Sequence, residues 1–315
     1  EGKEKEKWDL YMPCGYNRVE MELTGIKTDN ENQMIFGISG CDRIVSKNSL
    51  WSVMKDKFGR ERASKMMPET YVLSDKQDMK AFQKKFDKSK YYVLKKNVQR
   101  KKGIKFSNNL EEINKAASDN FRLVQKYIDD CFVINKRKLN LRIYMVVVCQ
   151  KGNIEVYGHK LGKCLYTSKD VSDSKVPIFE ENVTNSYLVE KHIIEQNPLT
   201  LDDLEVYLDK HGYDGKLLFE RTYQLMKNLS QAIMKPLCKL DSLKNNKSFQ
   251  LFGLDVIFND KLEPLLLEIN KGPDMIPKDN HDEELKTKVQ ADMFQKVGVI
   301  EIKEKGYENG LIKLN

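Results

Sequence analysis

The stretch FQLFGLDVIFNDKLEPLLLEINKGP, residues Phe249–Pro273, decides the fold. Its apolar residues form two runs, over 251–258 and 265–269, and the turn between them begins with Asn-Asp-Lys at 259–261. Two apolar runs joined by a short polar turn are typical of a β-hairpin. The sequence therefore predicts a two-stranded ribbon late in the chain, and the other segments are interpreted around it.

Three polar side chains interrupt this ribbon. Asp255 lies inside the first run, while Glu268 and Asn270 lie two residues apart at the end of the second and so share a face. A carboxylate among apolar neighbours is costly unless a partner compensates it. Two carboxylates and an amide suit a hard cation such as Mg²⁺, whose coordination shell a nucleotide completes. The hairpin alone leaves an alternative open, a solvated strand end on which the acids are incidental.

The composition indicates a soluble globular chain. Of its 315 residues, 40% are hydrophobic and 32% are charged, and a chain of this length is expected to form two or three subdomains. The longest apolar run, Ile143–Cys149, is too short to span a bilayer, and the alternating charges of Glu1–Lys7 do not resemble a signal peptide. We therefore expect no membrane partner.

The cysteines and histidines show no metal-binding spacing. The six cysteines lack a C-x-x-C pair, and the four histidines are scattered. This pattern favours reduced thiols in a cytoplasmic protein and speaks against a zinc site. The net charge of +7 allows an acidic partner without requiring one.

A basic segment accompanies the predicted strand Tyr91–Lys95. Ten basic residues lie from Lys84 to Lys105, close to Gly103. The segment is either a solvated loop or a cover whose lysines and backbone N–H groups neutralise a polyphosphate. Nucleic acid ranks below both, because few aromatic residues are placed for base stacking.

A long β-branched run, Arg137–Cys149, predicts a central strand that is buried on both faces. Arg142 inside this run needs an anion, because a buried guanidinium without one is costly. The anion is either a protein carboxylate, as in a structural ion pair, or the phosphate of a ligand.

Helical periodicity and capping residues predict the remaining elements. Helices are expected over 49–67, 75–86, 110–117, 200–211, 216–239 and 282–299, with Ser49, Ser74, Asn109 or Asn108, and Thr200 as candidate N-caps. A strand is expected over 121–128, and a polar loop over 163–187.

Seven motifs occur in the order that a known family shows. They are V-L-K at 93–95, K-G-I at 102–104, L-V-Q-K-Y-I at 123–128, K-x-N-L-R-I-Y at 138–144, T-N at 184–185, F-x-L-F-G-L-D-V at 249–256 and L-L-E-I-N-x-x-P at 266–273. With P-E-T-Y at 68–71, they make the chain resemble the tubulin tyrosine ligase-like family, a branch of the ATP-grasp ligases. The resemblance implies an α/β (α+β) ATP-grasp fold. It has a small N-terminal domain (1–67), a central domain (68–136) and a larger C-terminal domain (137–315) that carries the hairpin.

The resemblance also implies an activity. Such enzymes are ATP-dependent ligases that add a free amino acid, most often glutamate, to a glutamate side chain or terminal carboxylate of an acidic protein tail. ATP and Mg²⁺ convert the acceptor into an acyl phosphate, which the amine attacks. The alternatives are a ligase for a non-tubulin protein or a small acid, with glycine or tyrosine as donor, a catalytically silent nucleotide-binding relative, and a basic nucleic-acid binder.

The motifs carry the family's functional residues onto this chain. The resemblance implies that the phosphates are contacted by Lys95, Lys102 and Gly103, and that adenine is bound by a hinge of Gln125, Lys126, Tyr127 and Ile128. It implies further nucleotide contacts by Lys138, Asn140, Thr184 and Asn185. It also places Arg142 on the transferring phosphate and makes Asp255, Glu268 and Asn270 the ligands of Mg²⁺.

The chain departs from the family pattern at four positions. Asn140 stands where members usually carry aspartate, Asn182 replaces a histidine, and Gly272 replaces a serine. Lys163 stands where amino-acid-extending members carry an arginine for the carboxylate of the incoming amino acid, and a lysine cannot form a bidentate fork. No departure removes a metal ligand or Arg142, so we expect an active enzyme.

Overall fold

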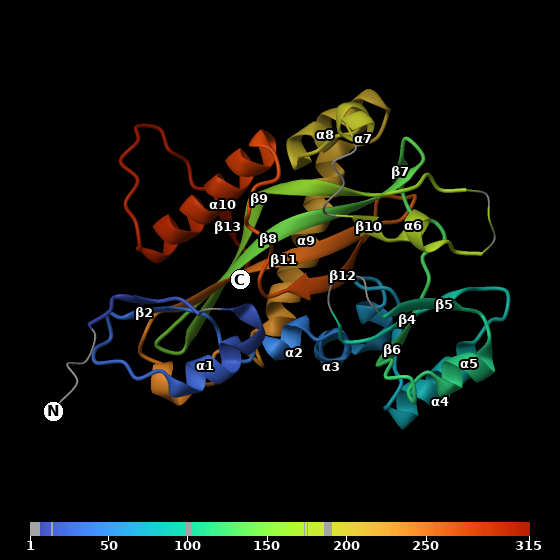
Figure 1. Ribbon diagram of the computed structural model, residues 1–315, viewed down its shortest axis with the longest axis horizontal. Helices are drawn as coiled ribbons and strands as arrows, with labels where there is room; N and C mark the ends of the chain where they lie inside the picture. Colours follow the sequence, from blue (N-terminus) through green and yellow to red (C-terminus); the bar gives the residue numbers. More distant parts are fainter. Residues whose placement is uncertain (1–6, 14, 99–102, 173, 175, 186–190) are drawn as a thin grey trace.

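The computed structural model describes residues 7–13, 15–98, 103–172, 174, 176–185 and 191–315. Two β-sheets dominate the described part, a nine-stranded main sheet and a four-stranded small sheet (Figure 1). Helices pack on both, so the mixed α/β class expected from the sequence is confirmed. No helix within the described ranges is long and apolar enough to cross a membrane.

The main sheet runs in the order β1-β2-β11-β8-β9-β10, and β12 pairs with β11, β13 with β9 and β7 with β8. Its strands are β1 (Leu10–Tyr11), β2 (Met34–Phe36), β7 (Val133–Ile134), β8 (Arg137–Gln150), β9 (Asn153–Thr167), β10 (Thr184–Asn185), β11 (Ser248–Phe258), β12 (Pro264–Asn270) and β13 (Leu311–Lys313). The predicted hairpin is β11 and β12, which pair antiparallel, and the predicted central strand β8 lies between β11 and β9.

The small sheet has the order β3-β6-β4-β5. It consists of β3 (Thr70–Val72), β4 (Tyr92–Lys95), β5 (Ile104–Ser107) and β6 (Leu123–Lys126), with α4 (Lys76–Lys85) and α5 (Leu110–Lys115) packed on it. The predicted division at residues 67 and 136 stays a prediction. The small sheet falls between these limits, whereas β1 and β2 join the main sheet beside β11.

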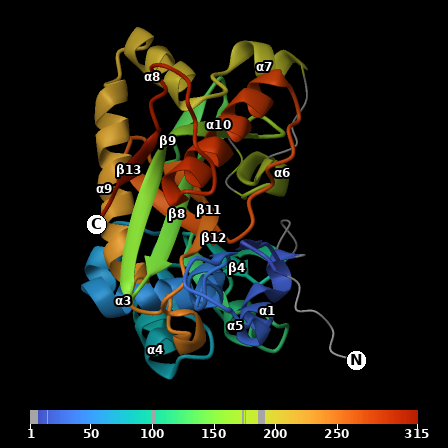
Figure 2. The same ribbon diagram turned by 90° about the vertical axis from the view of Figure 1, so that its left-hand side faces the viewer.

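The two faces of β8 explain where the helices pack. Its odd-numbered residues from Leu139 to Cys149 belong to a core with α9 (Gly215–Ile233) and α3 (Lys47–Ala63), whereas Tyr144, Val146 and Val148 pack under α10 (Asn280–Val297). Figure 2 shows α9 and α10 on opposite sides of the main sheet. The same face of β8 carries Lys138, Asn140 and Arg142 beyond the end of α10, and there it is polar because it faces a cavity.

The remaining elements are short or peripheral. They are η1 (Tyr16–Arg18), α1 (Val19–Gly25), α2 (Asp42–Val45), α6 (Phe179–Asn182), α7 (Lys191–Gln196), α8 (Leu201–Lys210) and η2 (Asp241–Leu243). The predicted caps Asn109 and Thr200 are confirmed, and Thr200 forms a complete capping box with Asp203.

Three local predictions were wrong. Helix α3 begins after Ser46 rather than Ser49, and Asp75 rather than Ser74 caps α4, because the Asp75 carboxylate accepts from two backbone N–H groups of the first turn. The predicted loop 163–187 begins as strand, since β9 continues to Thr167 through backbone pairing with β8 despite its polar residues.

The cysteines also differ from the prediction. Cys149 and Cys238 form a disulfide, whereas Cys41, Cys131 and Cys164 are free thiols among the described residues. The two bonded cysteines are separated by 89 residues in the sequence and brought together by the packing of β8 against the segment after α9, so their spacing could not reveal the pair.

Candidate functional site

A cavity of about 550 Å³ lies between the small sheet and the polar part of the main sheet. Most residues that the motifs selected line it, namely Lys95, Gln125, Lys126, Tyr127, Ile128, Lys138, Asn140, Arg142, Thr184, Asp255, Glu268 and Asn270. These residues come from β4, β6, β8, β10, β11 and β12 and from the residues just after β6. The structure therefore gathers them at one place, while their individual roles stay predictions.

The other selected residues lie elsewhere or outside the described part. Gly103 packs against Lys96 with a left-handed φ of 81°, where a Cβ would clash with the Lys96 side chain. Lys102 and the side chain of Asn185 lie outside the described residues, although the backbone of Asn185 pairs with Tyr166.

Four neighbouring strands carry a row of charged side chains across the main sheet. Glu268 on β12 is opposite Asp255 on β11, Asp255 is opposite Arg142 on β8, and Arg142 is opposite Lys163 on β9. Residues directly opposite each other on adjacent strands point to the same face. The row thus places two carboxylates beside two cations on the face that α10 and the cavity share.

The centre of the row is a bidentate ion pair. Arg142 donates from Nε to Asp255 Oδ1 at 2.6 Å and from Nη2 to Asp255 Oδ2 at 3.1 Å. Burial and the neighbouring carboxylate of Glu268 raise the pKa of Asp255, although Arg142 opposes that shift. The sequence left two partners open for Arg142, and in the structure it pairs with the protein carboxylate Asp255.

Glu268 has a partner that the sequence did not suggest. The ammonium of Lys47, from the first turn of α3, lies 3.0 Å from Glu268 Oε2. Burial would raise the pKa of Glu268, but Lys47 and Lys95 hold it below its ordinary value. A lysine in the first turn of a helix interacts unfavourably with the helix dipole, so its position indicates a nearby anion. The sequence could not reveal this, because the predicted start of the helix was Ser49.

The cavity wall attracts anions. Its described lining has six basic side chains (Lys47, Lys95, Lys96, Lys126, Lys138 and Arg142) and three acidic ones (Asp255, Glu268 and Asp274). Burial lowers the pKa of Lys95 to about 8, although the carboxylate of Glu268 opposes the shift. A phosphate entering the cavity would stabilise this desolvated ammonium.

Asn140 has one unused hydrogen-bonding atom. Its Nδ2 donates to Thr184 Oγ1 at 3.0 Å, but its buried Oδ1 has no partner among the described residues. A buried acceptor without a donor is costly, so a ligand hydroxyl that donates to it would be favoured. The hydroxyls of a ribose fit this requirement.

The far end of the cavity combines polar and apolar groups. Lys138 Nζ donates to Tyr127 Oη at 2.7 Å and to Asn182 Oδ1 at 2.6 Å. Apolar side chains that could hold a flat ring also line the cavity, namely Val93, Ile104, Phe106, Leu165, Val183, Ile257 and Leu267, and the ring of Phe106 contacts that of Tyr127. Gln125 already donates to Thr70 Oγ1 at 2.9 Å, so its amide supports the wall from behind.

Lys163 is held outside the cavity lining. Its ammonium lies 2.7 Å from Asp282 Oδ1, and Lys286 lies 2.7 Å from the other oxygen of the same carboxylate. Burial lowers the pKa of Lys163, which Asp282 opposes. Lys163 would therefore have to exchange Asp282 for a substrate carboxylate in order to bind one.

The hairpin carries side chains of the kind that bind magnesium, and the magnesium site stays a prediction. Asp255, Glu268 and Asn270 offer oxygen atoms from adjacent strands, and Asn270 Nδ2 lies 3.5 Å from Asp255 Oδ2. A second group, Glu20, Cys41 and Asp42, lies close together in the described part. Asp42 pairs there with Lys271, and burial raises the pKa of the Cys41 thiol, so the group is a poor metal site.

Sequence comparisons relate the chain to known proteins. The sequence model of the Tubulin-tyrosine ligase family matches residues 26–306. Human tubulin polyglutamylase TTLL6 is 26% identical over 314 residues, which cover 91% of this chain and 33% of that protein. Mouse tubulin monoglutamylase TTLL4 is 24% identical over 301 residues, which cover 89% of this chain and 25% of that protein. Tubulin polyglutamylase ttll-5 of Caenorhabditis elegans is 27% identical over 214 residues, which cover 63% of this chain and 29% of that protein. The chain spans about a third or less of the length of these relatives.

Proposed function

Because the chain belongs to the tubulin-tyrosine ligase family, we propose that it is an ATP-dependent carboxylate–amine ligase of ATP-grasp type. Its substrates would be ATP, a free amino acid and a glutamate side chain or terminal carboxylate in an acidic protein tail. The observation that carries this proposal is the charged row at a cationic cavity of about 550 Å³, a volume in the usual range for small-molecule sites.

The side chains have separate roles in this proposal. Lys95 would hold phosphate oxygens, the unpaired Oδ1 of Asn140 would accept from a ribose hydroxyl, and the apolar wall beyond Tyr127 would hold the purine. Asp255, Glu268 and Asn270 would hold Mg²⁺, which supplies neutralisation of phosphate charge. The remaining cations would then bind the phosphates that Mg²⁺ does not neutralise.

Arg142 has the central position for group transfer. The acceptor carboxylate would attack the terminal phosphorus of ATP, so that ADP leaves and an acyl phosphate forms. The amine of the free amino acid would attack the acyl carbon, phosphate would leave, and an amide would form. Arg142 would stabilise the negative charge on the transferring phosphoryl group in both steps.

The acceptor and donor are proposed on chemical grounds. The net charge of +7 and the basic segment from Lys84 to Lys105 would attract an acidic tail, with screening over about 8 Å at physiological ionic strength. Glutamate is the favoured donor because the three relatives described above are named as glutamylases. Lys163 would bind its α-carboxylate after releasing Asp282.

The test is the intact mass of an acidic peptide after incubation with protein, MgATP and one amino acid at a time. We expect a mass gain of whole glutamyl residues and release of ADP, and the added mass identifies the donor directly. Glu268→Gln should abolish both, because it removes a charged metal ligand. Equal mass gain in both proteins would refute the metal site, and nucleotide binding without any mass gain would indicate a catalytically silent relative.

A further inference from the structure

We propose that Lys47 is the counter-ion of the metal site. Because of it, the protein binds free Mg²⁺ weakly and binds the ion tightly only together with a triphosphate. This inference rests on the proposed function, because it concerns the same carboxylates. It concerns a residue of the N-terminal part of the chain that contacts a site otherwise built from the two sheets.

The position of Lys47 calls for an anion. It is the first residue of α3, and this fully described helix has no acidic residue in its first turn. The N-terminus of a helix carries partial positive charge, so an ammonium there is unfavourable unless an anion compensates it. Glu268 is that anion, and the Lys47 side chain is only 16% exposed in contact with it.

The charged row explains why Glu268 needs this cation. Asp255 and Glu268 are directly opposite on adjacent strands, and like charges in that position repel each other. Arg142 neutralises Asp255 through two hydrogen bonds and so leaves Glu268 to another cation. Lys47 supplies it, so side chains of the protein neutralise both of the proposed metal-binding carboxylates.

The charge of the cavity then decides when a metal ion can enter. With six basic and three acidic side chains among the described lining residues, the cavity is already positive. A free Mg²⁺ would have to displace Lys47 from Glu268 and add charge of the same sign. A triphosphate would make the net charge of the cavity negative, and its oxygens would pair with the displaced ammonium of Lys47.

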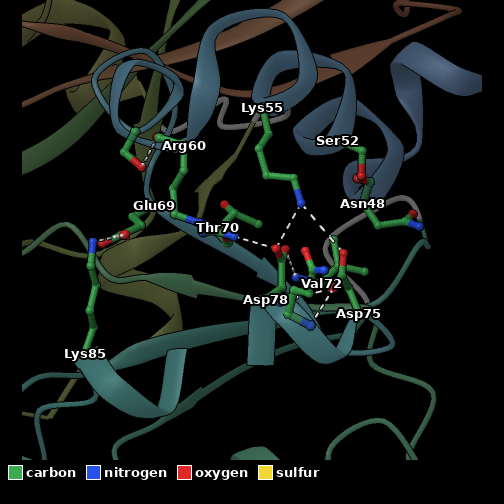
Figure 3. Close-up of polar contacts among 12 residues, drawn as sticks. Asn48, Ser52, Lys55, Arg60, Glu69, Thr70, Val72, Asp75, Asp78 and Lys85 are labelled. Carbon is green, nitrogen blue, oxygen red and sulfur yellow. Dashed lines mark hydrogen bonds and ion pairs between the residues drawn. The ribbon is translucent and has the colours of Figure 1, made fainter. Parts of the chain in front are cut away.

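Another lysine of α3, Lys55, forms an ion pair that joins two helices away from the cavity. Lys55 Nζ lies 2.9 Å from Asp78 Oδ1 and 3.7 Å from an oxygen of Asp75 (Figure 3). Asp78 also pairs with Arg60 and accepts from the backbone N–H of Val72, and its side chain is only 3% exposed. This cluster joins α3 to α4 and does not line the cavity, so Lys55 is a matched control.

The experiment titrates Mg²⁺ by calorimetry, and Mn²⁺ by electron paramagnetic resonance, into three proteins without nucleotide. We expect the parent to show no saturable binding below millimolar metal. Lys47→Gln should bind free metal at least about tenfold more tightly, because one nearby positive charge is gone. The control Lys55→Gln should match the parent in metal binding and lose thermal stability instead.

A second titration uses a non-hydrolysable ATP analogue with the metal. Analogue binding to the parent, together with unchanged free-metal affinity in Lys47→Gln, would overturn the inference and leave the proposed function standing. Failure of all proteins to bind the analogue would overturn the proposed function itself. Should Lys47→Gln not fold, Lys47→Met provides a second neutral variant. Lys47→Arg keeps the positive charge and should bind free metal as weakly as the parent.

Discussion

Two partly buried charged clusters beside the main sheet have similar residues but different surroundings. The cavity cluster consists of Lys47, Arg142, Asp255 and Glu268, and the clasp cluster consists of His159, Lys288, Asp292 and Tyr307. Each contains a carboxylate that accepts hydrogen bonds from a cationic or potentially cationic side chain. The cavity cluster borders a space that a ligand can enter.

The clasp cluster is satisfied internally. Asp292 accepts from His159 Nε2 at 2.9 Å, from Lys288 at 2.8 Å, from the hydroxyl of Tyr307 and from the backbone N–H of Gly310. The other ring nitrogen of His159 accepts from the backbone N–H of Leu161 at 2.9 Å. Burial lowers the pKa of His159, which favours the neutral ring. This cluster holds the segment before β13 against β9 and α10.

The difference teaches that burial and charge do not identify a functional site by themselves. The cavity cluster has an exchangeable cation, Lys47, and a neighbouring acceptor without a partner, Asn140 Oδ1. The clasp cluster has neither among the contacts described. Substitutions in the cavity cluster should therefore change the activity, and substitutions in the clasp cluster should change the free energy of unfolding.

The largest effect on activity is expected at Arg142. Arg142→Ala should lower the rate of transfer by at least about 10²-fold, as removal of a transition-state donor does in other enzymes. Affinity for the ATP analogue should change little, because the other phosphate contacts remain. Mass gain of the acceptor peptide measures the rate, and calorimetry measures the affinity. Full activity in this variant would remove Arg142 from the mechanism.

The next effect concerns stability in the clasp cluster. Asp292→Asn should lower the free energy of unfolding by about 3–5 kcal/mol, because it leaves buried partners without their shared anion. Urea denaturation measures this loss, and the rate of transfer per folded molecule should match that of the parent. A variant that kept its stability, or lost activity while folded, would contradict the separation of the two clusters.

The smallest effect is expected at the unpaired acceptor. Asn140→Ala should weaken nucleotide binding by about fivefold, which corresponds to about 1 kcal/mol for one hydrogen bond. The comparison of ATP with 2′-deoxy and 3′-deoxy analogues shows which hydroxyl donates. The variant should lose its preference for that hydroxyl, whereas equal preference in both proteins would assign the acceptor to another role.

The hairpin part of the site could be predicted from local signals, whereas most of the other candidate residues came from the resemblance to a known family. The hairpin pattern located Asp255, Glu268 and Asn270, and Arg142 was noticed as a charged residue inside an otherwise apolar strand. Such patterns depend on residues a few positions apart. They determine which side chains share a face before any tertiary contact is known.

The unpredicted features depend on contacts between distant segments. Lys47 and Glu268 belong to elements at opposite ends of the chain, and Lys163 meets Asp282 only when α10 packs beside β9. The disulfide between Cys149 and Cys238 has the same origin. No periodicity connects such residues, so only the folded arrangement reveals them.

The charged row also sets a length for compounds directed at this protein. Glu268 and Lys163 lie on β12 and β9, with β11 and β8 between them, which makes three strand spacings of about 4.8 Å, or roughly 14 Å in total. Under the proposed function, Mg²⁺ would bind at Glu268 and the amino-acid carboxylate at Lys163, so a bisubstrate inhibitor that joins a metal-binding group to an amino-acid carboxylate would need a linker of that reach. Shorter linkers would engage one end of the row only, and a series of increasing linker length would serve as a molecular ruler for the two subsites.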